Sequence, residues 1–323
     1  MVDRRQFTLG AASAGLAPLL AAGAHAQAID QLKLFVPAAP GGGWDQTART
    51  VEQVLRASGL VKGLQIANVP GAGGAVGLPQ FLNNWKGQSN ALMVAGMVMV
   101  GSLIANKSPL RISQAVPVAR LTGEFQVVAV PAASPFKTFK DFVDALKADP
   151  TKVPVAGGSA GGTDHIMLGM IAKAIGVSPA KVSYVAFAGG GPALAAMLGN
   201  QVAAGVSGYG EFSEQIKAGK LRTLAISSDK RQDGIDAPTI RESGVDVEVF
   251  NWRGVFAPPG VSADGRAAMI ALMQKMVATA EWKKACEDRD WTPIALFGDD
   301  YKAYVDSENA RIEAILKDLG LAS

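Results

Sequence analysis

The chain has 323 residues, of which 18% are charged, and its 31 Lys and Arg against 28 Asp and Glu leave a net charge of +3. Because positive and negative charges are nearly equal in number, overall positive charge is not expected to drive binding to nucleic acid or to an anionic membrane. The one cysteine, Cys286, excludes an intrachain disulfide, and we expect it to be a buried or idle thiol. The length predicts about two domains.

The N-terminus is typical of an export signal. Arg4 and Arg5 are followed by an uncharged stretch rich in Ala, Leu and Gly, which contains the small-x-small pattern Ala-His-Ala at 24–26. The residues around the two arginines resemble a twin-arginine signal, and an ordinary secretory signal is the alternative. We therefore expect a signal peptide over 1–26, cleavage after Ala26, and a mature periplasmic chain that begins near Gln27 and carries a charge of +2.

Strand and helix patterns alternate along the rest of the chain. In chain order we expect a strand at 32–36, a helix at 45–55, a strand at 65–68, a helix at 75–82, strands at 91–95, 116–121 and 126–130, and a helix at 139–148. There follow strand 153–156, helix 164–175, strand 182–186, helix 192–198, strand 203–207, helix 211–218 and strand 221–227. The last part has a strand at 245–252, a Pro-Pro-Gly break at 258–260, and helices at 263–279, 281–288 and 300–319. Apolar strands that alternate with helices predict an α/β fold with a mostly parallel sheet.

Four polar or cyclic residues indicate how three of these helices begin. Asp45 can cap the helix at 45–55, and Pro192 suits the first position of the helix at 192–198. Asp299 and Asp300 are expected to cap the last helix.

No repeat or low-complexity linker marks a domain boundary. Two strand-like crossings, near 122–126 and 225–228, are the best candidates for one. They predict a first domain made of 27–124 and 228–323, and a second domain, 125–227, inserted into it.

Glycines gather in four clusters, each after an expected strand and before an expected helix. Glycine lets backbone N–H groups approach a ligand closely, and the start of a helix favours negative charge. The clusters therefore predict a protein that binds an anion through its backbone. They lie at 41–43, 71–74, 157–162 and 189–191, and we expect 71–74 to serve mainly the fold.

Two enzyme-like interpretations of these loops can be weighed. A dinucleotide fingerprint fails because Val76 stands where the third glycine is required, and no G-x-x-x-x-G-K-[ST] occurs. The loop at 157–161 does match G-x-S-x-G, so a secreted serine hydrolase with Ser159 as nucleophile is the alternative function. Its base would have to be His165, which lies at the start of the next helix and cannot easily return to the hydroxyl. We prefer the interpretation in which Ser159, Thr163 and the loop N–H groups bind an anion.

No metal site and no cofactor are expected. One His and one Cys after the signal, far apart in the chain, cannot form a zinc site without carboxylates. His165 is either a structural helix residue or a ligand contact. Trp44, directly after three glycines, belongs either to the core or to the wall of a pocket.

Several segments together match a known family. The chain resembles the TctC or Bug family, the periplasmic substrate-binding proteins of tripartite tricarboxylate transporters. The matching segments follow in order along nearly the whole mature chain. They are 36–37, 40–45, 48–49, 68–74, 158–165, 189–191 with Ala193, 199–202, 205–207 and 256–260.

The resemblance implies an α/β, two-domain periplasmic binding protein (type II-like, a Venus flytrap) with a ligand cleft between the domains. It also implies a protein that is not an enzyme and that binds a carboxylate with two loops, 38–45 and 159–165, without a buried Lys or Arg. Gly189 and its neighbours and 208–209 would form the floor and wall of the cleft. The ligand-binding residues implied in this way are Ala38, Ala39, Pro40, Gly41, Gly42, Gly43, Trp44, Asp45, Ser159, Ala160, Gly161, Gly162, Thr163, His165, Phe187, Gly189, Gly208 and Tyr209.

The resemblance further implies a monomer that delivers its ligand to the large and small integral-membrane subunits of a tripartite transporter. The Trp-Asp pair after the first glycines favours citrate-like di- and tricarboxylates, and an aromatic carboxylate such as terephthalate stays open. Pro192 departs from the more polar residue expected there, which puts contacts at that position in doubt. A binding protein of the same fold that feeds a sensor kinase is a further alternative.

Overall fold

The structure is a computed structural model, and it describes residues 29–322. The expected signal peptide and its cleavage site lie outside these residues. Within them, no helix is both long enough and apolar enough to cross a membrane.

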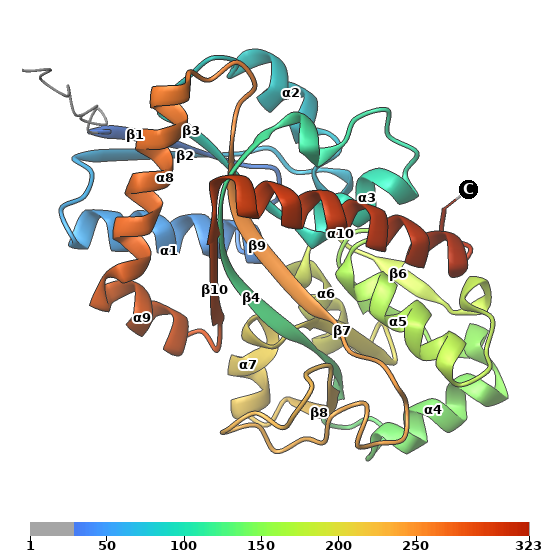
Figure 1. Ribbon diagram of the computed structural model, residues 1–323. Coiled ribbons are helices and arrows are strands. Elements are labelled where there is room, and N and C mark those ends of the chain that lie inside the picture. Colours follow the sequence, from blue (N-terminus) through green and yellow to red (C-terminus); the bar gives the residue numbers. More distant parts are fainter. Residues whose placement is uncertain (1–28, 323) are drawn as a thin grey trace, which may run out of the picture.

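Within residues 29–322, ten strands form one curled sheet (Figure 1), in the order β2-β1-β3-β9-β4-β7-β5-β6, with β8 and β10 also paired to β4. The pairs of β1 with β2 and β3, and of β5 with β6 and β7, are parallel. Every pair made by β4 or β9 is antiparallel, so the prediction of a mostly parallel sheet is wrong for its middle. The strands are β1 (Gln31–Val36), β2 (Gly63–Asn68), β3 (Ala91–Gly96), β4 (Val116–Pro131), β5 (Val155–Gly157), β6 (Tyr184–Ala186), β7 (Ala204–Gly208), β8 (Leu221–Ile226), β9 (Phe250–Ala257) and β10 (Thr292–Phe297).

Helices pack against both ends of this sheet, and the predicted α/β class is confirmed. Figure 1 shows α1, α8 and α9 beside the end that contains β1 to β3, and α4 to α7 around the end that contains β5 to β8. The last helix, α10, packs along β4 and α3. The helices are α1 (Gly43–Ala57), α2 (Gly77–Asn84), α3 (Met97–Ala105), α4 (Phe139–Ala148), α5 (Thr163–Ala174), α6 (Gly190–Leu198), α7 (Tyr209–Lys217), α8 (Ala263–Ala278), α9 (Ala280–Glu287) and α10 (Gly298–Asp318).

The two strands expected at 116–121 and 126–130 are one strand, β4, of 16 residues. Its first part pairs with β9 as far as the partners Phe125 and Phe250, and its second part pairs with β7 and β8. β4 therefore belongs to both parts of the sheet and joins them at its middle. The domain limits predicted near 124 and 228 remain a prediction.

The interior of the described residues is mainly apolar, with some buried polar side chains among the apolar ones. A large cluster of buried side chains fills the sheet and its helices, and a smaller one lies around Phe125 and Phe212. Trp252 is completely buried and donates its indole N–H to Oε2 of Glu308 at 2.8 Å. Cys286 is buried, as expected, and burial raises the pKa of its thiol to about 11.

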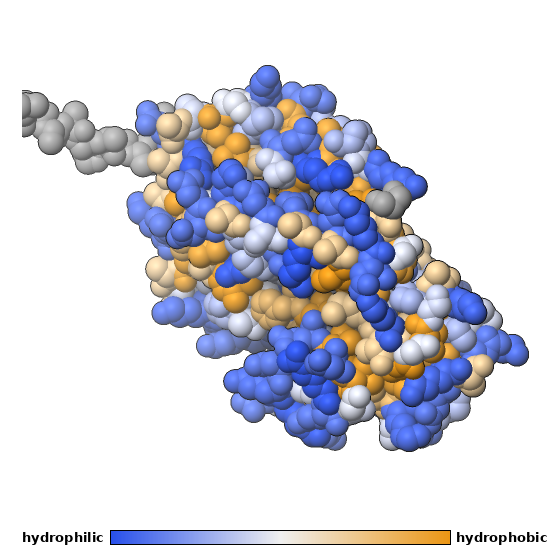
Figure 2. Space-filling view, turned by 45° about the vertical axis from the view of Figure 1, so that its right-hand side comes forward, coloured by the Kyte–Doolittle hydropathy of each residue, from blue (hydrophilic) through white to orange (hydrophobic). Residues whose placement is uncertain are grey.

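On the face that Figure 2 shows, hydrophilic side chains cover most of the outer rim.

Neither α3 nor β10 is predicted from the sequence. α3 is apolar on most of its faces and almost wholly buried, so it lacks the one-sided pattern of a surface helix. β10 carries partly or fully exposed residues without a clear alternation, and therefore lacks the pattern of a half-buried strand.

The strand expected at 245–252 begins later, since β9 is Phe250–Ala257. Val245, Val247 and Val249 alternate as in a strand and are buried, but they lie outside the sheet. Two expected helix starts are also wrong. α6 begins at Gly190, two residues before Pro192, and the cap of α10 is Phe297, so that the two acidic residues at 299–300 lie in its first turn.

Candidate functional site

All four glycine clusters meet around one cavity. The cavity is small, with a volume of about 90 Å³, and it is partly open to solvent. The expectation that 71–74 serves mainly the fold is therefore incomplete, because Gly71 and Gly73 line the cavity too. The lining glycines are Gly42, Gly43, Gly71, Gly73, Gly158, Gly162, Gly189 and Gly190.

The first loop joins β1 to α1 and is tied together by Asp45. This side chain is 2% exposed, and its Oδ2 accepts the backbone N–H of Gly41 at 2.9 Å. Asn68 donates to Oδ1 at 2.9 Å, and Arg49 donates to Oδ2 at 2.8 Å. Burial raises the pKa of Asp45, but these hydrogen bonds outweigh it, and the pKa lies below its ordinary value. Asp45 is thus the third residue of α1, and its side chain reaches back to the loop. The cap of α1 is Gly42, so the prediction that Asp45 caps this helix is wrong.

The second loop joins β5 to α5 and is built in the same way. Nδ1 of His165 accepts the backbone N–H of Gly161 at 3.1 Å, across the same four-residue spacing that joins Gly41 to Asp45. Gly161 and Gly41 both have positive φ, 73° and 86°, a conformation that glycine adopts without strain. Both loops therefore present the first turn of a helix to the cavity in the same manner.

The first turns of α1 and α5 leave backbone donors free. Among residues 29–322, the N–H groups of the first three residues of each helix have no hydrogen-bond partner within the fold. Neither helix has a side-chain cap at its N-terminus. Free N–H groups at a helix start, together with the helix dipole, favour an anion there. Two such starts facing one cavity can hold a carboxylate between them.

Further contacts join the loops across the cavity. A Cβ on Gly189 would lie 3.9 Å from Cα of Gly42, so the fourth glycine cluster touches the first. Ser102, on the unpredicted helix α3, donates to the carbonyl of Ala160 at 3.2 Å. Tyr184 donates to the carbonyl of Gly158 at 2.8 Å, and Thr163 donates to Oδ1 of Asn251 at 3.2 Å. The loops therefore already lie against one another.

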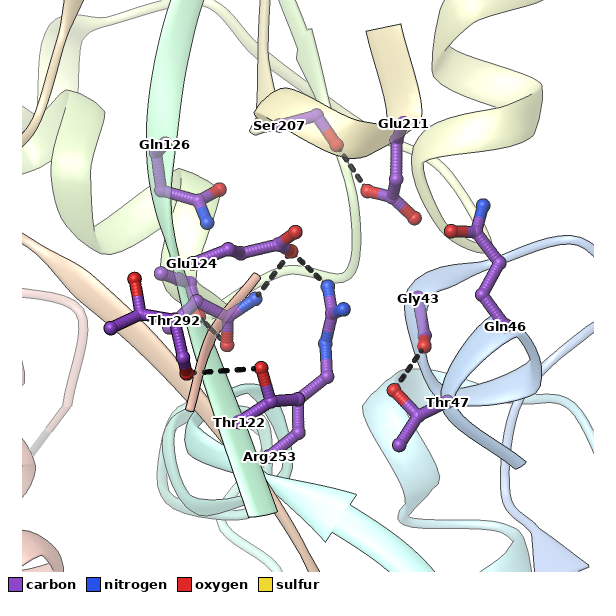
Figure 3. A network of polar contacts seen from close by, with 12 residues as sticks. Gly43, Gln46, Thr47, Thr122, Glu124, Gln126, Ser207, Glu211, Arg253 and Thr292 are labelled. Carbon is purple, nitrogen blue, oxygen red and sulfur yellow. Dashed lines mark hydrogen bonds and ion pairs between the residues drawn. The ribbon is translucent and has the colours of Figure 1, made fainter. Parts of the chain in front are cut away.

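Charged side chains from the middle of the sheet also face the cavity. Arg253 on β9 is 3% exposed and is paired with Glu124 on β4, which is 2% exposed (Figure 3). The ring of Trp291 lies 5.6 Å from the Arg253 guanidinium. Glu211 on α7 lines the cavity and accepts a hydrogen bond from Ser207. The buried Arg253 thus lies beside the glycine loops, where we expect no buried Lys or Arg from the sequence.

Two buried acids in this region have raised pKa values. Burial raises the pKa of Asp164 from its ordinary 3.8 to about 8, although the N–H of Gly158, at 2.7 Å from Oδ2, opposes the shift. Burial also raises the pKa of Glu124, from 4.5 to about 7, although Arg253 opposes it and Glu211 adds to it. Burial therefore favours the neutral form of both acids.

The predicted site residues divide into two groups. Those that line the cavity are Ala38, Gly42, Gly43, Trp44, Ser159, Gly162, Thr163 and Gly189. The others lie outside the lining and hold the loops and walls, as the bonds of Asp45 and His165 illustrate. They are Ala39, Pro40, Gly41, Asp45, Ala160, Gly161, His165, Phe187, Gly208 and Tyr209.

Three residues in the second group have clear structural roles. His165 stacks on Tyr184 with ring centroids 4.2 Å apart, and burial lowers its pKa to about 4. Its ring is therefore bonded to the loop and not to Ser159, which has no base there. Tyr209 is buried and stacks on Phe125, and Gly208 leaves room for the Glu124 carboxyl.

Several polar residues of the cavity are not predicted from the sequence. They are Asp164, Glu211, Asn251 and Arg253. A signal exists for the last two, because Asn251 and Arg253 are polar positions at a period of two in an otherwise apolar strand, which is unusual for a buried strand. The prediction of that strand at 245–252 left Arg253 outside it.

The chain is similar in sequence to proteins of one known family. Residues 47–321 match the family described as "Tripartite tricarboxylate transporter family receptor", TctC. Protein BugT of Bordetella pertussis is 27% identical over 301 residues, which cover 90% of this chain and 89% of BugT. A protein of Agrobacterium vitis, described as a UPF0065 protein, is 27% identical over 252 residues, which cover 76% of this chain and 72% of that one.

Solved structures share the fold. A structure described as that of a periplasmic transporter has a TM-score of 0.82 at 26% identity, covering 90% of this chain and 98% of that one. MatC from Rhodopseudomonas palustris with bound malate has a TM-score of 0.77 at 23% identity, covering 88% and 98%. R. palustris Rpa4515 with adipate has a TM-score of 0.79 at 19% identity, covering 90% and 98%. The fold is thus that of a two-domain periplasmic binding protein.

Proposed function

The chain belongs to the family of tripartite tricarboxylate transporter receptors, TctC, and we propose that it captures a small di- or tricarboxylate for delivery to such a transporter. The family and the fold are those of periplasmic solute receptors, which are not enzymes. The alternative of a secreted serine hydrolase with Ser159 as nucleophile is therefore wrong.

One observation carries the proposed ligand class. The first turns of α1 and α5 carry free N–H groups, follow loops that are built alike, and face one cavity. A carboxylate held between them receives charge-assisted hydrogen bonds from both loops, and each helix dipole adds to the attraction. We propose that the two loops 38–45 and 159–165 hold one carboxylate of the ligand in this way.

Ligand binding by two lobes gives a natural means of closure. We propose that 27–124 with 228–323, and 125–227, move as two bodies joined where the chain crosses between them, within β4 and near 225–228. The contact of Gly189 with Gly42, and the hydrogen bond from Ser102 to the second loop, support a closed arrangement in this structure. A ligand that bonds to both loops stabilises the closed form over the open one.

The ligand and partners follow from the family. Malate and adipate, named with two of the similar structures, are both dicarboxylates, which supports a citrate-like di- or tricarboxylate here. We propose that the protein acts as a monomer in the periplasm and passes its ligand to the large and small membrane subunits of the transporter. A role in feeding a sensor kinase is the second candidate, and the genes that neighbour this one would separate it from uptake.

A thermal-shift screen of small carboxylic acids tests this function. A ligand present at about 100 times its dissociation constant stabilises the folded protein by about 2.7 kcal/mol. We expect malate, adipate or citrate to raise the melting temperature, and neutral sugars and amines of similar size to leave it unchanged. If only sugars or amines raised it, the proposed ligand class would be wrong.

A further inference from the structure

The ion pair between Arg253 and Glu124 lies beside the cavity with its hydrogen bonding incomplete. Oε2 of Glu124 and both amide atoms of Gln126 are buried and have no hydrogen-bond partner in the structure. Glu124 and Gln126 lie on the same face of β4, because side chains two positions apart in a strand point the same way. Figure 3 shows the Gln126 amide next to the Glu124 carboxyl. Such unsatisfied buried groups are rare in folded proteins and call for an explanation.

Arg253 is well placed to meet a ligand. It lines the cavity, and its guanidinium packs so closely on Gly43 that a Cβ at that position would overlap it. Arg253 therefore lies at the start of α1, where the free N–H groups also face the cavity. The bond to Glu124 is the one hydrogen bond that the Arg253 side chain makes within residues 29–322. A guanidinium has five N–H donors, so it can also bind a second carboxylate.

The charges around the cavity oppose a dianion as long as Glu124 is ionised. Glu124 neutralises Arg253, and Glu211 adds a negative charge from α7. An incoming dicarboxylate would then bring two more negative charges into a region of low dielectric, where repulsion is strong. Protonation of Glu124 removes one of these charges and frees Arg253 at the same time.

We propose that Arg253 selects dicarboxylates by exchanging its partner: the second carboxylate of the ligand displaces Glu124 from the guanidinium, and Glu124 takes up a proton from solvent. This inference rests on the proposed function, in which the first carboxylate lies between the two glycine loops. No covalent bond changes, and the one group transferred is the proton that Glu124 gains.

The surroundings of Glu124 suit the neutral acid. A protonated Oε2 is a hydrogen-bond donor, and the amide oxygen of Gln126 on the same strand is a buried acceptor without a partner. The other polar groups that face Glu124 are Arg253 and Asn251 on β9, Glu211 on α7, Asp164 on α5 and the indole of Trp291. Burial already raises the pKa of Glu124, and the loss of Arg253 to the ligand raises it further.

Calorimetric titration of the purified protein with malate, adipate and citrate, each compared with its monomethyl ester, tests this exchange. For the best of these acids, the affinity should be about tenfold weaker at about pH 8 than at about pH 6, because binding then requires proton uptake. Titrations in two buffers of different ionisation enthalpy count the protons directly, and we expect uptake of close to one proton at about pH 8. The ester should bind at least about tenfold more weakly than the diacid.

Variants locate the effect. Glu124→Gln should bind the diacid with little dependence on pH, and Arg253→Gln should bind the diacid no better than the ester. Arg241→Gln, at a half-exposed arginine paired with Asp246 and Glu248 outside the cavity lining, is the matched control and should behave as the wild type.

Three results would overturn the proposal, and the first two need only the wild-type protein. An ester that binds wild-type protein as tightly as its diacid, or a diacid that binds without proton uptake, would contradict the exchange while leaving the carboxylate receptor intact. Full pH dependence in folded Glu124→Gln protein would show that another group, such as Asp164, takes up the proton. If none of the acids or esters bound, the proposed function itself would fail.

Discussion

Arg253 on β9 and Glu124 on β4 form an ion pair in which neither side chain is more than 3% exposed. The pair links two neighbouring strands at the middle of the sheet, and Arg253 lines the cavity in which the glycine loops meet. This buried pair therefore belongs both to the middle of the sheet and to the wall of the cavity.

The first prediction concerns the stability of this pair. Removal of one partner of a buried pair leaves an uncompensated charge and typically costs about 3 kcal/mol or more. We expect Arg253→Met to lower the free energy of unfolding by about 3 kcal/mol at about pH 8, and the double variant Arg253→Met, Glu124→Gln to recover most of it. Urea denaturation of both proteins measures this, and equal stability of the two variants would contradict it.

The second prediction concerns pH and Asp164. Its pKa is about 8 in the folded protein and 3.8 ordinarily, so the folded state holds a proton that the unfolded chain releases. This contribution to stability is fully present below the ordinary pKa of Asp164 and is lost as the pH rises through its folded value. We expect the melting temperature of ligand-free protein to fall between about pH 6 and about pH 9, and Asp164→Asn to reduce that fall.

His165 should act in the opposite direction. Its pKa is lowered to about 4 from 6.5, so the stability that the neutral ring provides is present above its ordinary pKa and lost as the pH falls through its folded value. His165→Gln should therefore lessen the loss of stability in acid, measured as the urea midpoint between about pH 7 and about pH 4. An unchanged acid midpoint would show that this histidine is not the group responsible.

Neighbouring glycines of the first loop should differ. A Cβ on Gly43 would overlap the Arg253 guanidinium, whereas a Cβ on Gly42 would have its nearest contact at 3.7 Å. We expect Gly43→Ala to cost about 1–3 kcal/mol of stability, and Gly42→Ala much less. Thermal denaturation compares the two, and the prediction fails if both variants melt alike.

The hydrogen bond from Ser102 should support closure on the ligand. Ser102→Ala removes the 3.2 Å bond to the carbonyl of Ala160 on the second loop. A hydrogen bond of this kind contributes about 1 kcal/mol, so the dissociation constant should rise about fivefold. Ser243→Ala, which removes a 2.9 Å bond to the carbonyl of Thr239 outside the cavity lining, is the matched control. Equal affinities of the two variants would exclude a role of Ser102 in closure.

The glycine loops could be predicted because their signal is local. The cluster at 41–43 follows β1 and precedes α1 within a few residues, so its place at the end of a strand can be predicted from neighbouring residues alone. Arg253 and Glu124 are 129 positions apart, and only the pairing of β4 with β9 brings them together. α3 was missed because it is apolar on most faces, and with it the contact from Ser102 to the second loop.

A crystal structure of the protein grown with the acid that stabilises it most would show how the ligand is held. We expect one carboxylate within hydrogen-bond distance of backbone N–H groups at the starts of both α1 and α5, and a second carboxylate on Arg253. An acid bound outside this cavity, or one that contacts neither glycine loop, would contradict it.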